Sequence, residues 1–183
     1  KIMTDLGRLI TAMVTPFKDN GDVDFERAKE FAKALVNTGS DGLLIGGTTG
    51  ESPSMSEEEK LELFKSVKDA VGSTASVIAG TTDNNTNASI DLSKKAEALG
   101  VDAILLTVPA YNKPTQEGLF QHFKKISESV SIPGILYNVP SRTALNMDVD
   151  TIEEANKMNS VIANATGDNY SDNYYKLVKK RIM

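Results

Sequence analysis

Residues 103–110 read AILLTVPA, an almost unbroken apolar run that ends at a proline. A strand with one solvent-exposed face alternates apolar and polar residues, whereas a parallel strand buried on both faces is apolar throughout. The same continuous pattern recurs in LITAMVTPF (9–17), GLLIGG (42–47), SVIAG (76–80), GILYNVP (134–140) and VIANAT (161–166). The sequence therefore predicts parallel β-strands at a spacing of about 30 residues, the length of one βα unit.

Helix start and stop signals fill the spaces between these runs. Asp24 can cap a helix over 25–38 that Gly39 ends, and Ser56 with Glu59 forms a capping box at the start of the next helix. Further signals are Thr86 before a helix that ends at Gly100, Thr115 as a cap, Asp148 or Asp150 at a fifth helix, and YYKLVKKRI (174–182) as the last. No linker or low-complexity tract divides the series, so we expect one domain over residues 1–183.

Strict alternation of strand and helix leaves two architectures, an open doubly wound sheet or a (βα) barrel. A nucleotide-binding open sheet would carry a glycine-rich phosphate fingerprint after its first strand, where this chain has TPFKDNGD (15–22). The polar loops follow the second, fourth and fifth strands instead, which is typical of a barrel site. We expect an α/β fold of TIM-barrel-type repeats, a partial barrel with six visible units of the eight that closure needs.

Composition excludes several classes of function. The chain has 183 residues, a net charge of −5, no Cys and one His, and its pI is about 5.0. This acidic balance argues against nucleic acid or an anionic membrane as a partner, and the missing Cys and single His argue against a metal site. The start KIMTDLGRL is unlike a signal peptide, so a cytoplasmic protein is expected. His122, on an amphipathic helix, is expected to be a packing or surface residue.

Three strand-end loops carry chemical character. The turn GGTTGES (46–52) offers backbone N–H groups and two hydroxyls to a carboxylate or phosphate, although a plain βα loop would look similar. Tyr111 lies between two prolines, where it could pack or react. Tyr137 and Arg142 follow the fifth strand, and a guanidinium grips a carboxylate with two parallel hydrogen bonds, a surface salt bridge being the alternative.

Taken together, GTTGESPSMSEEEK, YNKPTQEGLFQHF and ILYNVPSRT closely resemble the dihydrodipicolinate synthase family. This family belongs to the pyruvate-dependent Schiff-base aldolases, the superfamily of N-acetylneuraminate lyase. The resemblance runs from about residue 7 to residue 161 and is weak after that. It implies a TIM-barrel lyase that condenses pyruvate with aspartate semialdehyde in lysine biosynthesis, with no metal and no organic cofactor, as a homo-oligomer.

The resemblance also implies roles for individual residues. Thr48, Tyr111 and Tyr137 match the catalytic proton relay of the family, in which the residue at Tyr111 reaches across a dimer interface. Thr49 matches a residue that holds the pyruvate carboxylate, and Arg142 matches the one that binds the semialdehyde carboxylate.

The sixth strand departs from the family pattern. The family reads roughly I-K-E-A-T/S-G there, and its lysine forms the Schiff base, whereas VIANATGD puts Ala163 at the lysine position, about two residues closer to Tyr137. Because an amine is required for the iminium, we expect an inactive or impaired enzyme. Two alternatives stay open, a truncated or engineered barrel scaffold and a carboxylate-binding module without turnover. The chain also ends after the sixth helix, so exposed sheet edges are expected to promote self-association.

Overall fold

The computed structural model describes residues 5–158 and the backbone of residues 161–166. The chain divides into two compact units, the first comprising Lys1–Thr81 and Asp91–Leu105, the second Thr82–Ile90 and Leu106–Met183. Each unit is built from βα repeats, and the expectation of one domain over the whole chain stays a prediction. The predicted last helix, at 174–182, lies outside the described residues.

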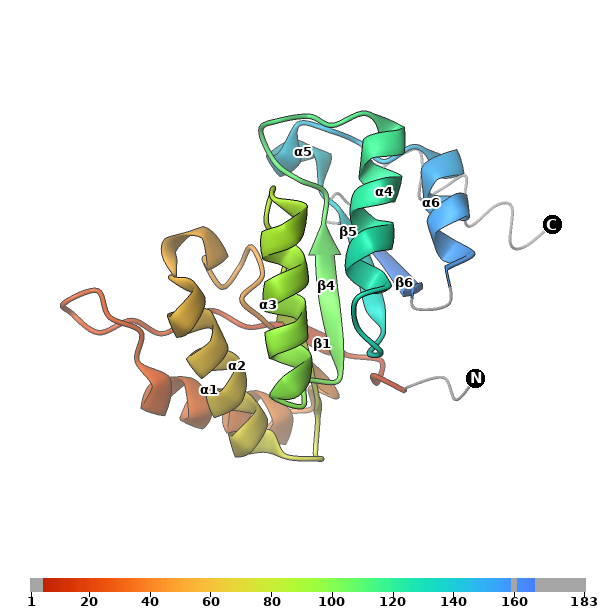
Figure 1. Cartoon of the computed structure of the whole chain (residues 1–183). Helices are drawn as coiled ribbons and strands as arrows, with labels where there is room; N and C mark the ends of the chain where they lie inside the picture. Colours follow the sequence, from red (N-terminus) through yellow and green to blue (C-terminus); the bar gives the residue numbers. More distant parts are fainter. Residues whose placement is uncertain (1–4, 159–160, 167–183) are drawn as a thin grey trace. The chain divides into compact units, whose positions relative to one another are not determined.

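The first unit is a parallel sheet with its connecting helices (Figure 1). Its strands are β1 (Ile10–Ala12), β2 (Gly42–Ile45), β3 (Ser76–Gly80) and most of β4 (Ala103–Thr107), each paired in parallel with the next. Helices α1 (Phe25–Asn37) and α2 (Glu57–Val71) pack against each other, and a short 3₁₀ helix η1 (Ser52–Ser54) precedes α2. Helix α3 (Thr86–Ala98) begins in the second unit and ends in the first.

The second unit contains the end of β4, followed by β5 (Gly134–Asn138) and β6 (Val161–Thr166). The N–H of Val108 donates to the carbonyl of Tyr137, and β5 pairs in parallel with β6, with a shift of register between Gly134 and Ile135. Its helices are α4 (Gln116–Ser127), the single turn α5 (Pro140–Thr143) and α6 (Val149–Asn156). Helix α6 packs against both α4 and β6, as Figure 1 shows.

The strands follow one another in the order of the sequence, from β1 to β6. A doubly wound sheet reverses its strand order at a switch point, whereas a barrel adds each strand beside the last. The observed order confirms the prediction of barrel-type βα repeats.

Burial along the strands confirms that most of them are covered on both faces. Four residues of β3 and four of β4 are buried, whereas β1 has none buried and leaves Ile10 37% exposed. Beside it, Leu9 is 56% and Val14 is 48% exposed. Among the described strands of the first unit, β1 is therefore the one whose apolar side chains are left uncovered.

Four strands are shorter than the sequence predicts, and prolines explain where two of them stop. The predicted strand over 42–47 ends at Ile45. The predicted strand over 9–17 pairs over Ile10–Ala12 and leaves the sheet before Pro16. The predicted strand over 103–110 ends at Thr107, before Pro109, and that over 134–140 ends at Asn138, because Pro140 opens α5 instead. Proline has no N–H for a sheet ladder but fits the first turn of a helix.

The N-caps of four helices lie at predicted positions, and one prediction is corrected. Asp148, one of the two candidates for the fifth predicted helix, is the N-cap of α6, although its side chain makes no capping hydrogen bond. The side chains of Asp24 and Thr115 accept the N–H groups of Arg27 (3.0 Å) and Gly118 (3.1 Å), and Ser56 forms the full capping box with Glu59. Thr86 was expected to precede α3 but is its first residue. The carboxamide oxygen of Asn85 takes the capping role and accepts the N–H of Asn87 at 2.9 Å.

Candidate active site

The turn after β2 presents two exposed threonines on a buried glycine frame. Thr48 and Thr49 are exposed, whereas Gly46, Gly47 and Gly50 are buried. The carbonyl of Gly47 accepts the N–H of Gly50 at 3.1 Å, which closes the turn on itself. Gly46 has a φ of 64°, a conformation that a side chain disfavours.

Close backbone approach and one threonine fix this turn in the first unit. A Cβ on Gly80 would lie 2.3 Å from the carbonyl oxygen of Gly46, so β3 runs directly against the start of the turn. The hydroxyl of Thr15, itself 6% exposed, donates to the carbonyl of Gly50 at 2.6 Å. The hydroxyls of Thr48 and Thr49 therefore project from a rigid backbone, which is what a small carboxylate site requires.

The loop after β4 presents Tyr111 to solvent in the second unit. Tyr111 is 92% exposed and has a φ of 73°, which is unusual for a bulky residue. Residues after β3 hold the loop, since the hydroxyl oxygen of Thr82 accepts the N–H of Thr107 at 2.7 Å. The carboxamide oxygen of Asn84 accepts the N–H of Ala110 at 3.0 Å, one residue before the tyrosine.

The loop after β5 carries the other two predicted side chains of this unit. Tyr137 is half-buried in β5, and Arg142 is exposed on α5. The N–H of Arg142 donates to the carbonyl of Val139 at 2.9 Å. Ala144 ends the turn in the left-handed conformation, with a φ of 56°.

Two carboxamides hold the segment that follows α5. Asn138, 4% exposed, donates from Nδ2 to Oδ1 of Asn146 at 2.8 Å, and its Oδ1 accepts the N–H of Met147 at 3.1 Å. Gln116, at the start of α4, donates from Nε2 to the carbonyl of Asn146 at 2.9 Å. Its Oε1 accepts the N–H of Asp148 at 3.0 Å and the hydroxyl of Thr151 at 2.8 Å.

The predicted site residues are divided between the two units. Thr48 and Thr49 share one turn of the first unit, and Tyr111, Tyr137 and Arg142 belong to the second. Thr48 follows β2 and Tyr137 is the next-to-last residue of β5, so both lie at the carboxyl ends of their strands. That they share one site stays a prediction, because they belong to different units.

Ala163 lies in β6, opposite Ile135 of β5, and Ala165 lies opposite Tyr137. The backbone register thus puts position 163 two residues before the partner of Tyr137. Its assignment to the place of the Schiff-base lysine stays a prediction.

His122 confirms the expectation of a packing residue. It is 7% exposed, its Nδ1 is 2.9 Å from the hydroxyl oxygen of Thr86, and its ring meets that of Phe123 edge to face. Its Nε2 is buried and has no hydrogen-bond partner among the described residues. Burial lowers the pKa of His122 below its ordinary value, and the charge of Asp83 opposes that shift.

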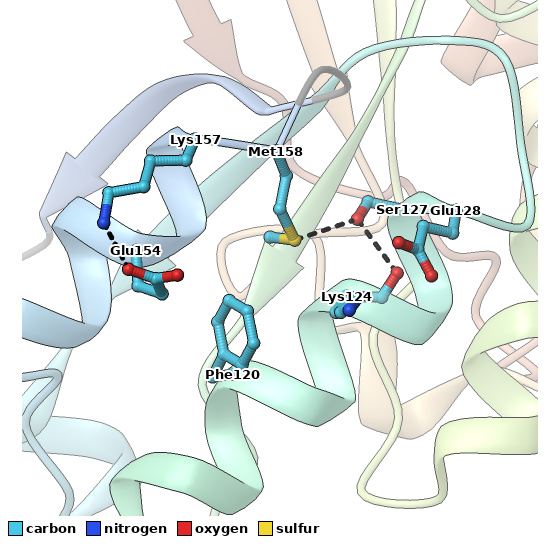
Figure 2. Close-up of a pocket in the computed structure, with 7 residues that line it drawn as sticks. All are labelled: Phe120, Lys124, Ser127, Glu128, Glu154, Lys157 and Met158. Carbon is cyan, nitrogen blue, oxygen red and sulfur yellow. Dashed lines mark hydrogen bonds and ion pairs between the residues drawn. The ribbon is translucent and has the colours of Figure 1, made fainter.

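A surface groove lies between α4 and α6 of the second unit (Figure 2). Lys157 pairs with Glu154 on one side, and the hydroxyl of Ser127 lies 3.8 Å from the sulfur of Met158. The Nζ of Lys124 is 5.9 Å from the ring centre of Phe120. Of these contacts, only that of Ser127 with Met158 links α4 to the segment that follows α6, and the sequence predicts no site residue here.

Among the residues that the structure describes, no three His, Cys, Asp or Glu side chains gather in a way that could hold a metal ion. None of their helices is long and apolar enough to cross a membrane.

The ordered βα units, with hydroxyl and guanidinium groups at the carboxyl ends of their strands, define a TIM-barrel-type fold of the kind that binds small ligands there. The family model of the dihydrodipicolinate synthetase family matches residues 5–183. The chain belongs to this family.

Individual relatives agree with the family model. A 4-hydroxy-tetrahydrodipicolinate synthase of Moorella thermoacetica is 54% identical over 164 residues, which cover 88% of this chain and 56% of that protein. A solved dihydrodipicolinate synthase of Bacillus anthracis has a TM-score of 0.94 at 44% identity, over 97% of this chain and 61% of that one. A solved synthase of Acinetobacter baumannii, in complex with pyruvate, has a TM-score of 0.92 at 35% identity and covers 96% of this chain and 60% of its own. The chain spans about half the length of the curated relatives it matches.

Sequence reasoning missed the residues that hold the loops. The sequence predicts Thr15 only as part of the strand over 9–17, and Asn138 only as part of the motif that carries Tyr137 and Arg142. A signal for Asn138 was present, because an amide at the end of a buried strand needs partners for its donors and its acceptor.

Proposed function

We propose that this chain supplies carboxylate-binding and proton-relay groups to a synthase site that condenses pyruvate with aspartate semialdehyde on the route to lysine. The observation that carries the proposal is the family match over residues 5–183. It is supported by a relative of known structure that holds pyruvate, and by the exposed Thr48 and Thr49 at the carboxyl end of β2.

The proposed roles follow from the chemistry of the two substrates. Both are carboxylates, so Thr49 with the backbone of the glycine turn holds pyruvate, and Arg142 grips the semialdehyde carboxylate with its fork of N–H groups. Thr48, Tyr111 and Tyr137 relay protons to and from the bound intermediate. Hydroxyl groups suit this relay because each one both donates and accepts a hydrogen bond.

The residue that would supply the amine of the reaction is the one that this assignment does not find in the chain. In the family, a lysine condenses with the keto group of pyruvate and releases water, and Ala163 offers no amine. On this assignment the chain binds the two carboxylates and turns them over slowly or not at all. The carboxylate-binding module without turnover is thus the closest alternative, and a scaffold that binds neither carboxylate is the next.

Reduction with borohydride in the presence of pyruvate tests the assignment, because it converts an imine into a stable adduct that intact-mass spectrometry detects. The native chain is expected to give no adduct, and Ala163→Lys is expected to gain one. An adduct on the native chain would show that another lysine, such as Lys113 in the loop of Tyr111, supplies the amine.

Thermal unfolding with pyruvate separates the alternatives. A ligand at 100 times its dissociation constant adds about 2.7 kcal/mol to the free energy of unfolding. Stabilisation of the native chain that Thr49→Val removes would support the site. No stabilisation at any pyruvate concentration would favour the scaffold.

We also propose that the chain self-associates. Tyr111 is 92% exposed, and Leu9 and Val14 expose 56% and 48% of their surface on the flank of β1. Covering these apolar groups would stabilise an oligomer. Sedimentation velocity should show a species larger than the monomer, and a monomer at every concentration would refute self-association. A location in the cytoplasm stays a prediction from the sequence.

A further inference from the structure

We infer that Gln116 and Asn138 are positioning residues, which set the place of the Arg142 guanidinium by clamping the segment 144–148 behind the single turn α5. The inference rests on the proposed role of Arg142 in binding the semialdehyde carboxylate. It assigns a specificity function to two carboxamides that the sequence motifs leave without one.

The turn that carries Arg142 is too short to be stable without contacts to the rest of the protein. Helix α5 has four residues, and a single turn is unfavourable in isolation because it fixes several dihedral angles for few hydrogen bonds. Its backbone bonds run from the N–H groups of Arg142 and Thr143 to the carbonyl of Val139, and from that of Ala144 to the carbonyl of Pro140. The hydroxyl of Thr143 adds contacts to the carbonyls of Val139 (3.2 Å) and Leu145 (2.9 Å), and none of these bonds reaches residues 146–148. External contacts must therefore fix its carboxyl end.

The two carboxamides supply these contacts from two different elements. Asn138 belongs to β5 and bonds the side chain of Asn146 and the N–H of Met147. Gln116 belongs to α4 and bonds the carbonyl of Asn146 and the N–H of Asp148. A strand and a helix thus hold three neighbouring residues that lie four to six positions after Arg142.

The geometry explains why amides serve here. Each carboxamide donates through its nitrogen and accepts through its oxygen, so it bonds a carbonyl-type group and an N–H group of the same segment at once. Leucine has a similar volume and can do neither. Because a guanidinium fork needs correct placement to form two parallel bonds, loosening the segment should weaken carboxylate binding at Arg142. The glycine turn belongs to the other unit and is held by contacts within that unit, so it should be unaffected.

The test uses two matched pairs of variants of the chain. Gln116→Leu removes the clamp on the α4 side, and Gln121→Leu is its control, since Gln121 is an exposed glutamine of the same helix that bonds Glu117. Asn146→Ala removes the group that Asn138 grips. Asn146→Asp is its conservative partner, because the carboxylate still accepts from Nδ2 of Asn138 at a half-buried position.

Two small carboxylates serve as probes in NMR titrations. Succinate semialdehyde reports on Arg142 through the Nε–Hε signal of its side chain, and pyruvate reports on the turn of Thr49. Gln116→Leu and Asn146→Ala should weaken binding of the semialdehyde about tenfold or more and change that of pyruvate less than about twofold. Gln121→Leu and Asn146→Asp should bind both probes as the native chain does.

Hydrogen exchange of the amides of residues 142–144 measures the clamp directly, without a ligand. It should become faster in Gln116→Leu and Asn146→Ala and stay unchanged in the two partner variants. Unchanged exchange in both disruptive variants, or equal weakening of both probes, would overturn the inference. If Arg142→Gln leaves semialdehyde binding intact while the exchange rates respond as expected, the proposed role of Arg142 fails and the clamp itself stands.

Discussion

The turn after β2 and the segment after β5 both present polar side chains at the carboxyl end of a parallel strand, and they are held in different ways. In the first, the start of the turn lies against Gly80 so closely that a Cβ there would be 2.3 Å from the carbonyl of Gly46. In the second, the carboxamides of Asn138 and Gln116 span the gap to the segment. One loop is fixed by backbone against backbone, and the other by side chains that reach out to it.

This difference determines what each loop tolerates. A loop fixed by close packing of backbones cannot accept one added methyl group, but changes in its exposed side chains leave its course intact. A loop fixed by amides has room for larger residues and depends on every donor and acceptor being matched. The first loop should therefore be destabilised by added volume, and the second by the loss of a hydrogen-bond donor or acceptor.

The largest effect is expected from Gly80→Ala in the first unit. The added Cβ would meet Gly46 at its carbonyl oxygen (2.3 Å) and carbonyl carbon (2.8 Å). Both are backbone atoms that cannot rotate away, so the free energy of unfolding should fall by more than about 3 kcal/mol. Urea denaturation measures the change.

Gly118→Ala in the second unit is the control for that substitution. Its Cβ would approach the hydroxyl of Thr115 at 3.2 Å, and alanine favours the helix by up to about 1 kcal/mol over glycine. Its stability should stay within about 1 kcal/mol of the native chain. A loss of similar size in both variants would contradict the idea that backbone proximity at Gly80 is what fixes the turn.

The next effect separates two buried threonines, Thr15 and Thr143, each replaced by valine. Thr15→Val removes the donor to the carbonyl of Gly50 and should cost about 1–2 kcal/mol. Thr143→Val should cost less, about 0.5–1 kcal/mol, for two reasons. The carbonyl of Val139 keeps its bonds to two backbone N–H groups, and the other bond of the hydroxyl, to the carbonyl of Leu145 at 2.9 Å, is only partly buried. Urea denaturation measures both losses of stability. Equal losses would mean that the two threonine hydroxyls contribute equally to holding their loops.

The repeat of parallel βα units could be predicted from the sequence because it rests on local patterns. Continuous apolar runs such as residues 76–80 form strands buried on both faces, and the spacing of Ser56 and Glu59 determines a capping box. The position of Thr48 and Arg142 after the ends of their strands could likewise be predicted, since each stands in a short motif that follows an apolar run.

The contacts that hold the loops could not be predicted from such patterns. Thr15 and Gly50 are 35 positions apart, and Gln116 and Asn146 are 30 apart, so their pairing depends on the register of the folded chain. The short course of β1 also depends on tertiary contacts, because the apolar run continues past Ala12 while the sheet pairing stops. The periodicity of apolar residues predicts where a strand or helix lies, but it does not predict which residues elsewhere in the chain it contacts.

A smaller effect, confined to acid conditions, is expected at His122. The imidazole is buried with an unpartnered Nε2, and its pKa lies below its ordinary value because burial disfavours the cation. The unfolded chain therefore binds a proton more readily than the folded chain, so stability should be lost as the pH falls below about 6.5, the ordinary value of histidine. Urea denaturation at about pH 7.5 and about pH 5.5 measures the loss.

Two variants isolate this contribution from that of the carboxylates. His122→Gln should lose less stability than the native chain between the two pH values, because glutamine does not titrate. Asp83→Asn should lose more, because Asp83 supplies the charge that raises the pKa of His122. An identical pH dependence in all three chains would mean that His122 stays neutral throughout or that its protonation is tolerated.

The smallest effect compares the caps of the helices that follow the two site loops of β2 and β4. Ser56 accepts the N–H of Glu59 while the Glu59 side chain accepts that of Ser56, so Ser56→Ala breaks a reciprocal pair and should cost about 1 kcal/mol. Thr115 has a single bond, to Gly118, and Thr115→Ala should cost about 0.5 kcal/mol. Glu59→Ala sharpens the comparison, because it removes one half of the box and should bring the α2 cap to the strength of the α4 cap. Thermal unfolding of the three variants should therefore show the greatest loss of stability for Ser56→Ala. A greater loss for Thr115→Ala would contradict this order. It would mean that the start of α4, next to Gln116, contributes more to stability than its cap alone.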